Sequence, residues 1–323
     1  MSSDPSWGVV STIKAPTTDI LNFAAHYLDL GARRVHIYLD ADDRAARSAL
    51  KRHPKCRVIL TDDGYWTRRR RKQGRPDGHQ HRQSVNATHC YTRDPQVDWL
   101  LHADVDEFLL PATPLPPQLA ALPAHTLSAR VRPIEALQPD PEDPPPPGQT
   151  WCKSFAPLQK DRRAQTNTIY PTYGDHLNGG FLSHVAGKVF VRTGQDNVSL
   201  RIHNAFVNKA MDPDPPDMPA CKLVHMHAHS WAHWQALYRY RLDHGSYRPS
   251  LKPAPRTDGT ALNMNALFTM LEQDGGQDAL RAFYTEVCVA TPALRTGLDR
   301  FGHLHAVTLD LDAKRTRHFP NHA

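Results

Sequence analysis

Between residues 7 and 111 the sequence alternates short runs of β-forming residues with stretches whose apolar residues recur at helical spacing. Such alternation predicts a parallel sheet whose strands are joined by crossover helices, which is the pattern of an α/β fold. Helices are expected to start near Thr17, at Asp42 or Asp43, and at Gln80. The expected strands are residues 7–14, 34–39, 57–61 and 97–103. This stretch is typical of half of a nucleotide-binding domain.

The regular alternation ends after Pro111. Proline is so frequent in residues 139–147 and 212–219 that we expect extended loops there and no interior of a helix or strand. Ser230 is the expected N-cap of an aromatic-rich helix. The remaining expected elements are short strands at 187–192 and 201–206 and helices at 230–243, 261–272 and 277–289. The prediction is therefore an α/β fold with a helical C-terminal region.

The composition limits the class of protein. With 323 residues, of which 40% are hydrophobic, the chain can form a sizeable core. Its 39 Lys and Arg against 33 Asp and Glu leave a net charge of +6, which favours an anionic partner. Five cysteines without a CxxC pair argue against a disulfide framework and a cysteine-based zinc site. Because no apolar run approaches the ~18 residues of a spanning helix, we expect a cytoplasmic protein, and leave peripheral contact with an anionic membrane surface open.

The most informative segment is WLLHADVDEFLL, residues 99–110, in which an apolar strand runs into a group of acids. In an extended chain, residues i and i+2 point to the same side about 6.6 Å apart, so Asp104 and Asp106 can address one cation while Val105 faces the core. Carboxylates at the C-terminal end of a parallel strand lie where open α/β sheets bind ligands. The alternative is an exposed strand end whose acids only cap a neighbouring helix.

Several of these residues together resemble the glycosyltransferase family 2-like enzymes with the GT-A fold, in a bacterial branch that carries a DVDEF motif. The matching residues are Lys14, Tyr38-Leu39-Asp40, Gln80 to Gln83 with Asn86, and Trp99 to Leu110. Residues 181–194, His203-Asn204 and 225–227 match more loosely. The chain departs from many relatives at Ala15-Pro16, where they have Asn-Glu.

The resemblance implies a GT-A fold, which is a Rossmann-like mixed sheet with flanking helices. The GT-A domain would cover residues 1–229, with a nucleotide-binding half at 7–111, an acceptor half at 112–229 and a helical extension at 230–323. The implied activity moves a sugar from a nucleotide-diphosphate donor, expected to be linked to UDP, to the hydroxyl of a glycan or other acceptor, with inversion. A divalent cation, Mn²⁺ or Mg²⁺, would assist the departing nucleotide.

The resemblance also assigns residues to the donor site. Asp40 would contact the base or ribose, and Arg82 or Asn86 would lie near the donor, which Lys14 at the end of the first strand would also help to bind. Asp104 and Asp106 would carry the sugar-diphosphate and its metal ion.

The general base and a later metal ligand are less well defined. In metal-dependent GT-A enzymes a later His often completes the coordination of the cation, and we expect His227, or failing that His225, in this role. Together with His229 these histidines alternate on an expected strand, and ordinary hydrogen-bonded histidines are the alternative. The candidates for the base that takes the acceptor proton are, in order, Asp175, His184 and Glu107.

Other charged and aromatic groups have two interpretations each. The cations at 68–72 suit a solvated loop or an anionic ligand, and they lack the interleaved aromatics that nucleic-acid binding requires. Lys188 and Arg192 suit either a leaving phosphate or an outward strand face. The aromatic residues of 230–243 suit core packing better than sugar stacking.

Three other classes of protein compete with the transferase hypothesis. A nucleotidyltransferase would share the acidic site but needs a Gly-rich phosphate loop, which residues 9–16 lack. A binding module on the same fold would follow if Ala15-Pro16 marks a degenerate donor site. A zinc hydrolase built on the histidines of 225–229 lacks an HExxH motif.

Overall fold

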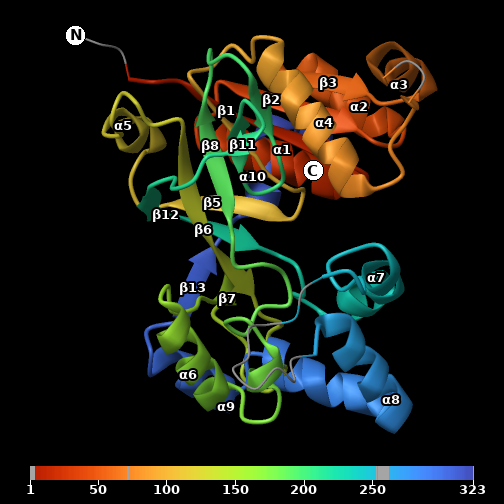
Figure 1. The fold of residues 1–323 in the computed structure, drawn as a ribbon, viewed down its shortest axis with the longest axis vertical. Coiled ribbons are helices and arrows are strands. Elements are labelled where there is room, and N and C mark those ends of the chain that lie inside the picture. Colours follow the sequence, from red (N-terminus) through yellow and green to blue (C-terminus); the bar gives the residue numbers. More distant parts are fainter. Residues whose placement is uncertain (1–3, 71–72, 252, 254–261, 323) are drawn as a thin grey trace. The chain divides into compact units, whose positions relative to one another are not determined.

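The computed structural model describes residues 4–70, 73–251, 253 and 262–322. The chain forms two compact units, each assembled from separated stretches of sequence. The first unit comprises residues 1–132, 186–223 and 310–323, and the second comprises residues 133–185 and 224–309. The predicted α/β class is confirmed, with a mixed sheet, flanking helices and helices toward the C-terminal end of the sequence (Figure 1). The domain boundary at residue 229 stays a prediction.

The first unit is built on a mixed sheet (Figure 1). Its strands include β1 (Trp7–Ile13), β2 (Arg34–Leu39), β3 (Cys56–Leu60), β4 (Trp99–His102), β8 (Lys188–Arg192) and β6 (Ser128–Ala136), which ends in the second unit. Strands run parallel in the order β3-β2-β1-β4, and β8 and β6 extend the sheet antiparallel. β5 (Glu107–Pro111) pairs with β12 (Asp217–His225). The parallel strands therefore bring their carboxyl ends, and the residues that follow them, to one edge.

Helices cover both faces of this sheet because the strand residues alternate between two cores. Val9 and Leu101 belong to the core under α1 (Thr17–Asp29) and α2 (Arg44–Arg52), which Asp43 caps as expected. Val10 and Leu100 belong to the core under α3 (Asp63–Arg70) and α4 (His79–Thr92). The smaller elements of the unit are α5 (Leu115–Ala120), β9 (Val198–Leu200), β10 (Ala205–Val207), β11 (Ala210–Met211) and η3 (Pro320–His322).

Helix α10 (Leu311–His318) completes the first unit by packing against α1. The buried His26 donates from Nε2 to the Leu109 carbonyl at 2.8 Å, and its Nδ1 lies 3.3 Å from Lys314 Nζ, 288 residues further along the chain. Arg315 donates to Asn22 Oδ1 at 2.6 Å. Burial, followed by the Lys314 charge, lowers the pKa of His26 to about 3, so the imidazole is neutral and accepts from the ammonium.

The second unit contains antiparallel strands and an aromatic helical core. Its elements are the end of β6, β7 (Gln149–Lys153), β13 (Leu304–Thr308), α6 (Gln159–Ile169), η2 (Gly174–His176), α7 (Trp231–Asp243), α8 (Met264–Cys288) and α9 (Pro292–Asp299). Ser230 caps α7 as predicted, accepting from His233 N at 3.2 Å. Trp234 and Tyr238 are buried in the core of this unit, which confirms the packing interpretation for them, whereas Tyr240 is half-exposed.

The structure corrects the expected loop in the basic stretch. Residues 63–70 form helix α3, which Asp62 begins by accepting from Tyr65 N at 2.7 Å. The helix is stable there because Tyr65 and Trp66 are buried against the sheet. The cations at 71 and 72 lie outside the described residues.

Later expectations are also corrected in part. Strand β12 passes through Pro219, where we expected an extended loop. Pro219 has no N–H to donate. The next residue, Ala220, still accepts from Ala112 N at 2.8 Å. His227 and His229 lie in a turn after β12, so the three histidines do not alternate along one strand. The two helices expected after 261 form the single element α8, kinked at Gly276, and the strand expected at 201–206 is confined to β10.

Candidate functional site

The candidate site lies at the carboxyl edge of the parallel strands of the first unit. Exposed Lys14 follows β1, Asp40 follows β2, Thr61 follows β3, and Asp104 comes two residues after β4. Ligands of open α/β sheets bind at this edge, because the strand ends and the following loops converge there. The sequence placed all four positions correctly at strand ends.

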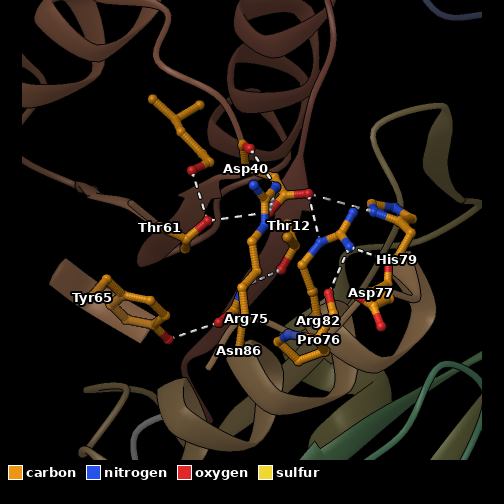
Figure 2. Close-up of polar contacts among 11 residues, drawn as sticks. Thr12, Asp40, Thr61, Tyr65, Arg75, Pro76, Asp77, His79, Arg82 and Asn86 are labelled. Atoms are coloured by element: carbon orange, nitrogen blue, oxygen red, sulfur yellow. Dashed lines mark hydrogen bonds and ion pairs between the residues drawn. The ribbon is translucent and has the colours of Figure 1, made fainter. Parts of the chain in front are cut away.

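Asp40 is the centre of a buried polar cluster (Figure 2). Its side chain is fully buried and accepts from Arg75 Nη2 at 3.0 Å and from Arg82 Nε at 2.8 Å. Thr61 Oγ1 lies 3.3 Å from Oδ1, and His79 Nδ1 lies 3.9 Å from Oδ2. Burial opposes ionisation of Asp40, but His79 and the two guanidinium groups outweigh it and hold the pKa below its ordinary value.

Arg82 fastens a loop over this cluster, as Figure 2 shows. Its Nη1 donates to the carbonyls of Pro76 at 2.9 Å and Asp77 at 2.6 Å, and only 13% of its side chain is exposed. Arg75 comes from the same loop, but 43% of its side chain is exposed. Arg82 is therefore occupied by protein acceptors, whereas Arg75 presents a cation to the solvent side of Asp40.

Asn86, which the resemblance places near the donor, is fully buried. Its Oδ1 accepts from the Tyr65 hydroxyl at 2.7 Å, and its Nδ2 donates to Thr12 Oγ1 at 3.1 Å (Figure 2). These contacts tie α4 to α3 and to β1. Asn86 thus has a supporting role, because its side chain holds together the elements that carry the site.

A second charged cluster joins β4, β5 and β8. The Lys188 ammonium is fully buried, 2.8 Å from Asp104 Oδ2 and 3.2 Å from Glu107 Oε2. Gln83 Nε2 donates to Asp104 Oδ1, and Glu107 accepts from the backbone N–H of Asp104 at 2.8 Å. Burial opposes both charges, but their attraction prevails, so the pKa of Asp104 is lowered and the pKa of Lys188 is raised. Lys188 therefore carries no outward strand charge, contrary to one of its two interpretations.

The expected extended geometry of the acidic motif is wrong. Val105 and Asp106 form a turn, closed by a hydrogen bond of 3.0 Å from Glu107 N to the Asp104 carbonyl. The turn forms because Glu107 also binds the backbone of Asp104 through its side chain. Val105 still packs against the core, and Asp106 lies half-buried at the turn.

The acids of this turn suit a hard divalent cation by donor type, because carboxylate oxygens are the ligands that Mg²⁺ and Mn²⁺ prefer. Asp104 keeps 24% of its side chain exposed and has lone pairs left after its bonds to Gln83 and Lys188. The Lys188 charge competes with a cation for this carboxylate.

The other residues predicted as base or later metal ligand, Glu107 excepted, belong to the second unit. His227 Nε2 lies 3.0 Å from the Tyr247 hydroxyl, and its ring centroid lies 5.1 Å from that of His225. The His225 ring lies 5.8 Å from that of His184. Asp175 is exposed in η2 and accepts from Asn167 at 2.7 Å. Their assignment as metal ligand or base stays a prediction, as does that of Glu107, which here orients the Asp104 turn.

The sequence did not identify Arg75 or Thr61 as members of the site. Thr61 was detectable from its position at the end of an expected strand. Arg75 had no such signal, because it lies in a polar stretch with many other cations.

Comparisons with models of known protein families and with curated proteins find no match. Among the described residues, no helix is both long and apolar enough to cross a membrane.

Proposed function

We propose that this chain is a glycosyltransferase of the GT-A type that moves a sugar from a nucleotide-diphosphate donor, expected to be UDP-linked, to an acceptor hydroxyl. One observation carries the proposal: the Asp40 cluster and the Asp104 turn lie at the ends of parallel strands β2 and β4, separated only by β1. The resemblance around both motifs supports it. The donor would lie along this edge.

The residues of the first unit have distinct proposed roles. Arg75, held by Asp40 and partly exposed, would contact the anionic or ribosyl part of the donor, while Arg82 and Asn86 maintain the loop and helix around it. Lys188 would keep Asp104 ionised and fixed. Asp106, with Asp104, would hold Mn²⁺ or Mg²⁺, which when bound supplies Lewis-acid stabilisation of the departing diphosphate.

A test is hydrolysis of a panel of nucleotide sugars with and without Mn²⁺. We expect metal-dependent turnover in the wild type and a loss of about a hundredfold or more in Asp106→Ala. Asp214→Ala, which removes an exposed carboxylate elsewhere in the first unit, is the matched control and should retain the activity. Metal-independent turnover that survives in Asp106→Ala would contradict the proposal.

The second candidate is a binding module on the same fold. Asp40 and Asp104 both accept hydrogen bonds from cationic side chains of the protein, and this observation favours the binding module over the transferase. Calorimetry with UDP and Mn²⁺ separates the two: a module would bind glycan without metal-dependent binding of nucleotide.

A further inference from the structure

The first unit contains a cavity of about 170 Å³ away from the strand ends that carry the candidate site. It is lined by residues 49 and 52–54, at the C-terminal end of α2, and by residues 318–322, at the end of α10 and in η3. Strands β2 and β3 are parallel neighbours, so α2, which joins them, returns the chain from the carboxyl edge of the sheet to its amino edge. The cavity therefore lies at the opposite edge of the sheet from the candidate site.

The lining of this cavity is cationic. Its titratable side chains are Arg52, His53, His318 and His322. Among the described residues that line it, none is acidic. Asp29 Oδ1 lies 3.6 Å from His318 Nε2, but Asp29 also pairs with Arg317. The C-terminal carbonyls of α2 add a partial negative charge, which the full charges of Lys51 and Arg52 in its last turn outweigh. The cavity therefore favours a negatively charged ligand.

Arg52 and His53 keep donors for such a ligand. The exposed Arg52 donates from Nη1 to Ser48 Oγ at 2.7 Å, which leaves Nε and Nη2 to bind an oxyanion. His53 Nδ1 accepts from Lys55 N at 3.3 Å, so the neutral ring carries its proton on Nε2. Burial, followed by the charges of His318 and Lys55, lowers the pKa of His53, which keeps this ring neutral near neutral pH. An oxyanion can thus accept from a charged guanidinium and from a neutral imidazole N–H.

The rest of the lining is partly apolar and is held in place. Ala49 and Phe319 are buried, and the centroid of the His53 ring lies 5.7 Å from that of Phe319. Arg315 Nε donates to the His322 carbonyl at 3.0 Å, which holds η3 on α10. The cavity is smaller than the ~300–1,000 Å³ of sites for drug-sized ligands, so it suits a small molecule.

A metal ion fits this cavity less well than an anion. The groups of described residues whose ligand atoms lie within 4.8 Å of one another do not include the histidines of the cavity. The ring centroids of His53 and His318 are 5.8 Å apart. A metal ion would also bring a second positive charge beside Arg52.

We propose that this cavity binds a small organic anion, a carboxylate with a flat apolar body, through Arg52 and the Nε2–H of His53. The carboxylate would accept charge-assisted hydrogen bonds from the guanidinium, and the apolar body would lie against the aromatic side of the cavity. This site goes beyond the proposed sugar transfer and does not depend on it.

The test is NMR titration of the wild type with benzoate, with benzamide and acetate as the comparison ligands. Benzamide keeps the ring and loses the charge, whereas acetate keeps the charge and loses the ring. We expect benzoate to bind at least about tenfold more tightly than either of them, because only benzoate satisfies both parts of the cavity. The signals that shift should include the ring protons of His53 and His322.

Two variants locate the binding. Arg52→Met should weaken benzoate binding at least about tenfold with little change in Tm, because Arg52 is exposed. His53→Phe keeps a flat ring and removes the N–H, so it should weaken benzoate binding several-fold and leave benzamide binding nearly unchanged. Arg44→Met removes an exposed cation at the other end of α2, with 91% of its side chain in solvent, and should bind benzoate as the wild type does.

Four results would overturn the proposal. They are no binding of benzoate to the wild type, equal binding of benzoate and benzamide, equal binding of benzoate and acetate, and an equal effect of Arg52→Met and Arg44→Met. The last of these would show that the net charge of the helix, and not the cavity, attracts the anion. Loss of sugar transfer would leave each of these outcomes unchanged.

Discussion

Lys188→Met tests whether charge pairing around the Asp104 turn stabilises the first unit. Methionine keeps most of the length and apolar stem of lysine, so packing changes little. The ammonium that it removes lies 2.8 Å from Asp104 and 3.2 Å from Glu107, and both carboxylates would be left facing each other. Removing one partner of a buried ion pair costs about 3–5 kcal/mol. We expect the lower end, about 3 kcal/mol, because Asp104 keeps part of its side chain in solvent and can be hydrated.

The assay is urea unfolding followed by tryptophan fluorescence and circular dichroism at neutral pH. Adding Glu107→Gln to the Lys188→Met variant should restore more than half of the lost free energy, because it removes the repulsion between the two acids. Lys209→Met, in an exposed turn, is the control and should stay within about 0.5 kcal/mol of the wild type. A loss below about 1 kcal/mol with an unchanged m-value would refute the reasoning, as would a double variant less stable than the single one.

Three further predictions concern other parts of the first and second units. Burial lowers the pKa of His26 to about 3, so below pH ~6.5 the unfolded chain binds a proton that the folded chain does not, and the free energy of unfolding falls. Between pH ~7.5 and ~5, His26→Gln should lose about 2 kcal/mol less of this free energy than the wild type, as measured by urea unfolding. An equal loss in the two proteins would argue against this. Arg82→Met should lower the Tm by several degrees, because Arg82 holds the loop carbonyls of Pro76 and Asp77. Arg75→Met should leave the Tm nearly unchanged and weaken the binding of UDP measured by calorimetry, because the Arg75 side chain is partly exposed. An equal fall in Tm for both variants would show that both residues are structural. Gly180→Ala should lower the free energy of unfolding by about 3 kcal/mol or more, because the φ of Gly180 is 76° and a Cβ would collide with the buried ring of Tyr170. Gly194→Ala, with φ 75° and open space around it, should lower it by about 1 kcal/mol. Equal losses of stability in thermal unfolding would contradict the difference.

The sequence predicts the parallel half of the sheet well because local patterns determine it. Strands β1 to β4 and helices α1, α2 and α4 follow from apolar spacing, and Asp43 and Ser230 cap helices where expected. Helix α3 was missed because its single cap, Asp62, and its two buried aromatic residues stand beside a long run of cations.

The contacts of the site residues could not be predicted in the same way. Lys188 reaches Asp104 only because β8 pairs with β4, and 84 residues separate the two in sequence. Arg75 likewise meets Asp40 across 35 residues through a loop without periodicity. Sequence patterns therefore indicated Asp40 and Asp104 as candidates, but tertiary pairing decides that these acids already have cationic partners.

The docking of α10 on α1 affects the order in which a nascent chain can mature. Asn22 and His26 leave the ribosome before the side chains that cover them, which are synthesised 293 and 288 residues later, respectively. Until α10 has been synthesised, the face of α1 that α10 covers stays exposed. Residues 133–185 and 224–309 can already assemble into their own unit by then. The first unit to begin folding is thus the last to finish, and chaperones would have the longest access to this helix.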